Sequence, residues 1–329
     1  MHLSDALMST PVAVGGGVIA ASLLAVAGDK MKKSDNPSLV PLMGVLGAFV
    51  FAAQMINFAI PGTGASGHVI GGVLLAAFLG PWAAFVTLAS VLIIQCLVFA
   101  DGGLLALGCN LLNMGATTTL IAYPLIFRPI TRNSTNIWRI SLAAILACTV
   151  GLELGSAMVT GEIVLSEITA LNPWSFLKIM LLIHLPIGIC EGIATGAVLA
   201  FVARQRPDLL QGSDHRPKKK NLKRILIGFG IATVVIACGL VWFASSNPDG
   251  LEWSVEREWT GDEAPPEETS IIMAGASRIV NTTSLMPDYE NPASGIVGAV
   301  IVLLIVWCLS SLLIKKPSKK NSSDEKCQN

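Results

Sequence analysis

Long apolar segments alternate with short polar segments along most of the chain. Nine such segments consist mainly of aliphatic residues with few charges. A bilayer core about 30 Å thick requires roughly 20 residues of helix, and backbone polar groups inside it must be satisfied internally. The pattern therefore predicts helices that cross a membrane. The segments cover residues 11–27, 39–59, 69–80, 82–100, 104–127, 138–160, 177–203, 223–243 and 295–314.

One apolar run, residues 69–100, is too long for a single span. Gly80 and Pro81 divide it, because this residue pair interrupts helices. The first part, residues 69–80, is short. The sequence leaves open whether it crosses the bilayer fully, tilts or re-enters.

The composition excludes an ordinary soluble domain. Of 329 residues, 53% are hydrophobic and 13% are charged, whereas a soluble domain has about 25% charged residues. The mean hydropathy is +0.66. We therefore expect an all-α polytopic membrane protein, with a seven-helix bundle followed by a two-helix accessory module, and no nucleic-acid partner.

The positions of lysine and arginine predict which side of the membrane each loop faces, because cytoplasmic loops are enriched in both. Clusters follow the first, fifth, seventh and ninth apolar segments. With nine spans and the N-terminus outside, 19 of the 22 cations lie on the cytoplasmic side, all but Lys178, Arg257 and Arg278. We expect a multi-pass protein of the cell inner (plasma) membrane with a cytoplasmic C-terminus.

The first apolar segment has one alternative interpretation. It ends in Ala25, Val26 and Ala27, which resemble a signal-peptidase site. A signal peptide carries cations before its apolar stretch, and residues 1–5 have none. Because the cations follow the stretch, we expect the segment to be retained as a span that begins outside.

A further shift in composition divides the chain into units. The loop between the last two spans, residues 245–294, has ten acidic and two basic residues and is expected to be flexible or partly ordered. The expected units are the bundle (1–203), a basic cytoplasmic linker (204–222), the accessory module with the acidic outer loop (223–314) and a polar cytoplasmic tail (315–329).

The seven cysteines do not form a recognisable framework. None belongs to a CxxC pair, and six lie in or beside apolar segments. A disulfide scaffold or zinc ribbon is therefore not expected, and small buried hydrophobic residues are the simplest interpretation.

Candidate metal chemistry begins at the N-terminus. Histidine is too large for removal of the preceding initiator, so Met1 is expected to stay. The Met1 amine and the His2 amide nitrogen would close a five-membered chelate ring, and the amide nitrogen and His2 Nδ1 a six-membered ring. Three nitrogens in one plane suit Ni²⁺ or Cu²⁺. A merely exposed histidine is the alternative.

A second histidine lies on the same predicted side. His68 ends a loop, residues 61–68, that contains three glycines and joins the second and third apolar segments. Glycines permit backbone conformations closed to other residues, so the loop can fold back towards the bundle. His68 would then supply a fourth nitrogen; a capping or interfacial histidine is the alternative.

The two remaining histidines differ in setting. His184 and Glu191 lie two turns apart on one face of a predicted span, where ionisable residues are commonly functional. A structural role, with Asn110, Asn113 or Glu153 as partners, is favoured for this pair. His215 lies in the basic linker and is expected to be a solvated surface residue.

Four segments of the first 203 residues together resemble the CbiM/NikM family, the substrate-specific components of energy-coupling factor transporters for cobalt and nickel. They are residues 1–7, 61–68, 99–110 and 184–192. Residues 248–253, which read Pro-Asp-Gly-Leu-Glu-Trp between two predicted spans, look like the small CbiN/NikN partner fused to the C-terminal side.

The resemblance implies a function, a metal site and partners. The metal would be held by the Met1 amine, the His2 amide and imidazole, and the His68 imidazole. A transmembrane coupling subunit and cytoplasmic ATPases would drive release inward. The chain lacks a GxxxxGK[ST] phosphate loop, so it is expected to be a transporter subunit and not an enzyme, without a permanently bound cofactor.

Three questions stay open. The sequence does not choose between nickel and cobalt, although a planar nitrogen set leans towards nickel and would also bind copper. The rival functions are an intramembrane metal-dependent enzyme using His184 and Glu191, and a regulatory subunit without its own ligand. The acidic loop acts either by charge or sterically through residues 248–253; the steric role is favoured.

Overall fold

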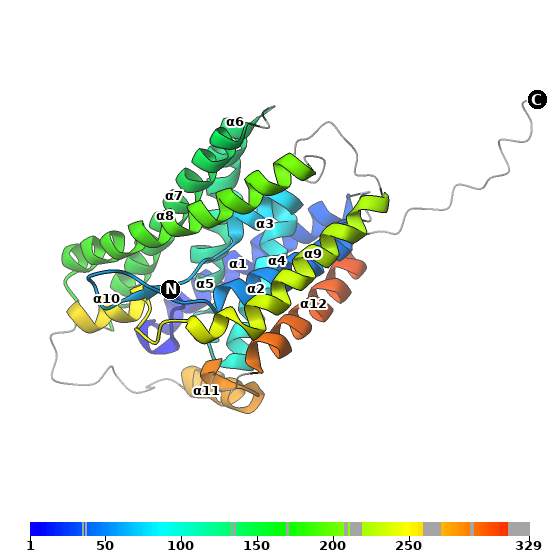
Figure 1. Ribbon diagram of the computed structural model, residues 1–329. Coiled ribbons are helices and arrows are strands. Elements are labelled where there is room, and N and C mark those ends of the chain that lie inside the picture. The colour runs from blue at the N-terminus through cyan, green and yellow to red at the C-terminus, as the bar shows by residue number, and fades with distance from the viewer. Residues whose placement is uncertain are drawn as a thin grey trace, which may run out of the picture.

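The computed structural model of the chain is mostly helical, and its helices pack around a common apolar interior (Figure 1). It describes residues 1–34, 36, 38–132, 134, 136–168, 171–206, 210, 219–258, 271–289 and 293–314. The N-terminal part contains η1 (Asp5–Leu7), α1 (Thr10–Lys32), α2 (Leu39–Gln54), α3 (Gly72–Leu79), α4 (Pro81–Phe99), α5 (Leu107–Asn110), η2 (Leu111–Phe127), α6 (Arg128–Thr131), α7 (Ile137–Ser166) and α8 (Pro173–Gln205). The C-terminal part contains α9 (Lys219–Cys238), η4 (Leu240–Phe243), α10 (Gly250–Glu258), α11 (Ile271–Thr283), η5 (Pro287–Tyr289) and α12 (Ser294–Leu313).

Helices occupy each predicted apolar segment. Among the described residues, five helices are long and apolar enough to cross a membrane, namely α1, α4, α7, α8 and α12, and α2 is a shorter apolar helix. Many of their aliphatic side chains point outward, as expected for surfaces that face lipid. The chain is therefore a multi-pass membrane protein.

The short apolar segment 69–80 contains α3, which has eight residues. At 1.5 Å per residue such a helix is about 12 Å long and cannot cross a hydrocarbon core of about 30 Å. Every residue of α3 is buried. It lies between Gly71 and Gly80, whose φ angles of 79° and 80° favour glycine. The segment is thus an interior helix.

The segment that follows α4 forms one continuous helix through α5, η2 and α6, and η2 has π-helical hydrogen bonding. Pro124 lies inside η2 and lacks the N–H that an α-helix would use. Thr117, Thr118 and Thr119 donate their hydroxyl hydrogens to carbonyls one turn earlier. These bonds satisfy buried hydroxyls within the bundle.

The C-terminal helices α9 and α12 lie against α2 (Figure 1). Small residues of α2 allow the approach of α12: a Cβ at Gly44 would lie 3.3 Å from the Leu303 carbonyl oxygen, and one at Gly47 would lie 3.3 Å from Val302 Cγ1. The structure uses them for internal packing.

The outer loop, which we expected to be flexible or partly ordered, is helical in much of the part that the structure describes. It contains α10, α11 and η5, because residues 250–258 and 271–283 form amphipathic turns that pack against α8 and α4. Residues 259–270, most of the linker with His215 (207–209 and 211–218), and the tail 315–329 lie outside the described residues.

One short β-hairpin accompanies the helices of the predicted all-α fold. Residues Phe58–Ala59 (β1) and Ser66–Gly67 (β2) pair as a short antiparallel hairpin before α3. The turn between them contains Gly62 and Gly64 with φ of 80° and 81°. A conformation that glycine adopts freely therefore closes the loop that ends at His68.

Candidate metal site

The N-terminal segment is folded into the bundle, as the chelate hypothesis requires. The Met1 residue is 4% exposed and Leu3 is 0% exposed. Leu3 N donates to Asn110 Oδ1 at 2.8 Å, and Asn110 Nδ2 donates to Leu3 O at 3.1 Å. Gly103 N also donates to Leu3 O at 2.8 Å. The start of the chain is thus held as an ordered, buried element.

Glycines make room for this terminus. A Cβ at Gly155 of α7 would lie 3.0 Å from Met1 Cε and would clash with the Asn113 carbonyl oxygen. A Cβ at Gly103 would clash with Asp5 Oδ1, which accepts a hydrogen bond from Ala106 N. The Met1 side chain is consequently anchored in a notch that a larger residue would fill.

The β1–β2 hairpin places His68 opposite the terminus. A Cβ at Gly67 would lie 2.6 Å from Ile187 Cγ1, so the end of the hairpin lies directly against α8. His68 Nδ1 lies 3.2 Å from the Val69 carbonyl oxygen. Donation from Nδ1 to this carbonyl leaves the Nε2 lone pair free to act as a ligand.

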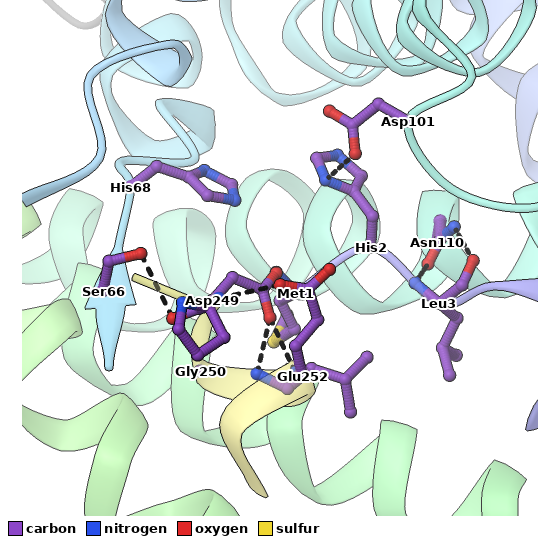
Figure 2. Close-up of polar contacts among 12 residues, drawn as sticks. Met1, His2, Leu3, Ser66, His68, Asp101, Asn110, Asp249, Gly250 and Glu252 are labelled. Atoms are coloured by element: carbon purple, nitrogen blue, oxygen red, sulfur yellow. Dashed lines mark hydrogen bonds and ion pairs between the residues drawn. The ribbon is translucent and has the colours of Figure 1, made fainter. Parts of the chain in front are cut away.

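The rings of His2 and His68 face one another (Figure 2). Their centroids are 5.5 Å apart and their planes differ by 10°. The Met1 amine lies beside them, next to the start of α10 (Figure 2). The structure therefore brings together all three sequence-predicted ligand residues, Met1, His2 and His68.

Two carboxylates hold nitrogen atoms of this site. His2 Nδ1 lies 2.9 Å from Asp101 Oδ1, and Tyr289 donates its hydroxyl hydrogen to Asp101 Oδ2 at 2.7 Å. The Met1 amine forms a buried ion pair with Asp249 Oδ2. In this arrangement the Met1 amine and His2 Nδ1 are bound to carboxylates, while His2 Nε2 is buried without a hydrogen-bond partner among the described residues.

Burial and neighbouring charge perturb the titration of the loop residues. Burial, the Met1 ammonium and His2 lower the pKa of His68 to about 4. Burial alone would raise the pKa of Asp101, but the charge of His2 and hydrogen bonds from His2 and Tyr289 lower that pKa to about 2. Burial alone would also raise the pKa of Asp249, but the Met1 ammonium outweighs it and holds that pKa well below its usual range. The carboxylates are therefore ionised and His68 is neutral near pH 7.

His184 and Glu191 have structural contacts, although not with the expected partners. Both oxygens of Glu191 accept backbone hydrogen bonds, from Gly71 N at 2.8 Å and Ile70 N at 3.0 Å. Glu191 thereby fixes the backbone at Ile70 and Gly71, directly before α3. His184 Nδ1 donates to Met180 O at 2.7 Å. The sequence pattern placed both on one face of α8 but did not reveal these backbone partners.

A cavity of about 720 Å³ opens over the two histidines. Residues of the bundle and of the C-terminal module line it together, including His2, His68, Asp101, Asp249 and Tyr289. Within the part of the chain that the structure describes, no three His, Cys, Asp or Glu side chains lie close enough together to hold a metal. A metal at this site would need main-chain nitrogens as well, which the N-terminus offers.

Sequence reasoning did not single out three residues of the site: Asp101, Asp249 and Tyr289. Asp101 belongs to a segment that carries the family resemblance, and Asp249 belongs to residues 248–253, which were singled out for a steric role. Their function depends on contacts between distant parts of the chain, which spacing in the sequence does not reveal.

Comparisons with known proteins match both parts of the chain. The model of the CbiM family, described as the cobalt uptake substrate-specific transmembrane region, matches residues 2–209. The model of the PDGLE domain matches residues 223–315. A crystal structure of a truncated transition metal transporter has 32% sequence identity, a TM-score of 0.54, and covers 62% of this chain and 99% of its own.

Relatives share both parts. The fused nickel transport protein NikMN of Rhodobacter capsulatus is 29% identical over 93% of this chain and 86% of its own length. A protein of Archaeoglobus fulgidus that bears the same NikMN name is 31% identical over 94% of this chain and 98% of its own. These relatives are named as transport proteins. The chain belongs to the CbiM/NikM family of nickel and cobalt transport proteins and carries a fused, CbiN-like PDGLE domain.

Proposed function

We propose that the chain captures Ni²⁺ or Co²⁺ with high affinity as the substrate-specific subunit of an energy-coupling factor transporter. The observation that carries the proposal is the pair of facing histidine rings, His2 and His68, next to the buried amine of Met1. Imidazole and amine nitrogens suit these metals, and an ordered N-terminus is unusual unless something holds it.

The proposed ligands are the Met1 amine nitrogen, the His2 amide nitrogen, His2 Nδ1 and a His68 ring nitrogen. His68 is neutral near pH 7 and its Nδ1 faces the Val69 carbonyl, so Nε2 is the available donor. For chelation, His2 Nδ1 must release Asp101 and the Met1 amine must release Asp249, so that both nitrogens can bind the ion. Asn110 holds the backbone at Leu3, directly after His2, through two hydrogen bonds.

The proposed topology has the N-terminus outside and the C-terminus in the cytoplasm, with this site at the outer face of the cell inner (plasma) membrane. The short helix α3 leaves this orientation unchanged, because His68 before α3 and Asp101 after α4 line the same cavity, so the α3–α4 pair begins and ends on one side. The units are the metal-binding bundle (1–203), the basic linker (204–222), the accessory module (223–314) and the tail (315–329). A transmembrane coupling subunit and cytoplasmic ATPases would supply the energy for release inward, since this sequence has no phosphate loop of the GxxxxGK[ST] type.

Nickel is the better fit of the two cargo metals, because a plane of nitrogen donors is a geometry that nickel favours. The relatives reported above that span both parts of the chain bear nickel-transport names. Another relative, the cobalt transport protein CbiM of Sorangium cellulosum, is 28% identical over 64% of this chain and 94% of its own, so cobalt is tested alongside.

Metal content tests the proposal. The full chain is expressed in nickel- or cobalt-supplemented medium, purified in detergent and measured by inductively coupled plasma mass spectrometry. We expect about one metal ion per chain, and almost none in a variant with both His2→Ala and His68→Ala. Metal-free protein, or equal metal in the double variant, would contradict it and would favour a subunit without its own ligand.

A further inference from the structure

The accessory module (residues 223–314) reaches the candidate metal site at two points. Asp249, just before α10, forms the ion pair with the Met1 amine. Tyr289, in η5, donates to Asp101, whose other oxygen contacts His2 Nδ1. The module therefore contacts the Met1 amine directly, through Asp249, and His2 Nδ1 indirectly, through the hydrogen bond from Tyr289 to Asp101.

Asp249 is held by α10 in one orientation. Its Oδ1 accepts hydrogen bonds from Leu251 N at 2.7 Å and Glu252 N at 2.9 Å, which is the geometry of a helix N-cap. Glu252 Oε2 in turn accepts from Asp249 N at 3.0 Å, completing a capping box. With Oδ1 used by the helix, Oδ2 is directed at the Met1 amine.

The segment before α10 is docked on the hairpin that carries His68. Ser66 N donates to Pro248 O at 2.8 Å, and Ser66 Oγ donates to Asn247 O at 2.8 Å. A Cβ at Gly250 would lie 3.1 Å from His184 Nε2, so α10 begins in direct contact with α8. Asp249 is thus placed by main-chain contacts on both sides and not by a flexible side chain alone.

The second contact is anchored in a similar way. The ring of Tyr289 stacks on Phe99, with centroids 4.7 Å apart and planes 16° apart. The Tyr289 hydroxyl hydrogen bond fixes Asp101, the residue that occupies His2 Nδ1. Docking of the module therefore stabilises the arrangement in which His2 Nδ1 is paired with Asp101.

We propose that Asp249 competes with the transported ion for the Met1 amine, so that the seated accessory module is the metal-excluding arrangement of the site. A metal–nitrogen bond is about 2.0–2.1 Å long, and the amine nitrogen cannot accommodate the ion and the Asp249 carboxylate on the same side. Capture requires Asp249 to withdraw with the start of α10. Its return, supported by Tyr289 on Asp101, displaces the ion. This inference rests on the proposed function and assigns the releasing residue.

Asp249→Asn separates competition from other roles of this residue. Asparagine keeps the side-chain oxygen that caps α10 but removes the charge that holds the amine. The matched control is Glu252→Gln, which removes one acidic charge from the same turn without touching Met1. Nickel and cobalt affinities of the three full-length proteins are measured by isothermal titration calorimetry, with thermal unfolding in detergent to confirm equal folding.

We expect Asp249→Asn to bind metal about tenfold or more tightly than the native chain, which corresponds to about 1.4 kcal/mol. Glu252→Gln should stay within about twofold, and Tyr289→Phe should give a smaller gain than Asp249→Asn because it acts only through Asp101. Equal or weaker binding by folded Asp249→Asn would overturn the inference and make Asp249 a ligand or counter-ion. If neither the native chain nor the variant binds nickel or cobalt, the proposed function fails as well.

Discussion

The rings of His2 and His68 lie almost parallel, with centroids 5.5 Å apart. The two residues are far apart in the sequence, because His2 is the second residue and His68 follows α2 and the β-hairpin. The pairing depends on two separate anchors: Asn110 holds the backbone at Leu3, and the β1–β2 hairpin is pressed against α8 at Gly67. Two ordered imidazoles and a buried amine thus form a nitrogen-rich pocket from two separate segments of the chain.

A residue added before Met1 should abolish high-affinity nickel and cobalt binding. Extension converts the terminal amine to an amide, removes one donor, and adds bulk where Met1 is 4% exposed. A tag after Asn329 is the matched control and should leave binding within about twofold. Calorimetric titration of both proteins checks this; normal affinity in the extended chain would rule out the terminal amine as a ligand.

Metal affinity should fall as the pH is lowered below about 6. Binding needs the Met1 amine and the His2 amide to lose protons, so protons compete with the ion more strongly as the pH falls. The pKa of His68 is about 4, so this ring is already neutral and adds little to the fall above pH 5. Affinities measured between pH 5 and 8 test this, and a flat profile would indicate carboxylate ligands instead.

Glu191→Ala should destabilise the bundle. It leaves the buried N–H groups of Ile70 and Gly71 without their acceptor, which costs about 1–3 kcal/mol for each group. Glu153→Ala is the matched control, because Glu153 Oε1 is buried without a hydrogen-bond partner among the described residues and its removal should cost little. Thermal unfolding in detergent compares the two; similar losses would contradict the proposed role of Glu191 in holding Ile70 and Gly71.

The acidic loop should act through its docked segment and not through its total charge. Replacing residues 248–253 with a Gly/Ser linker removes the contacts to Ser66 and Met1 and should abolish metal uptake while leaving metal binding in place. Neutralising Asp262, Glu263, Glu267 and Glu268, which lie outside the described residues, should leave uptake nearly unchanged. The reverse result in a cellular uptake assay would assign the loop an electrostatic role, which salt would screen over about 8 Å.

Hydrophobic periodicity predicted most of the fold, because the requirement to bury backbone polar groups in lipid leaves few alternatives to helices. It did not predict that α3 is enclosed on all sides. A short apolar segment has the same hydrophobic pattern whether its side chains face lipid or protein. The helices α10 and α11 were missed because their apolar residues are spaced along amphipathic turns and do not form a continuous run.

The candidate site was predicted in part. Met1, His2 and His68 were proposed as ligands because terminal amine and histidine chemistry can be read from the sequence, and they lie together in the structure. Asp249 was not, because its position depends on a helix cap in a distant module. The partners of His184 and Glu191 were also not predicted, since they are main-chain groups that any residue could provide.

The direct measurement of the metal site is X-ray absorption spectroscopy of the purified chain loaded with one equivalent of nickel. We expect a first shell of four nitrogen donors in a plane, contributed by Met1, His2 and His68, and loss of this signature in both His2→Ala and His68→Ala. A first shell of oxygen donors, or a nitrogen shell that persists without His68, would contradict the proposed site.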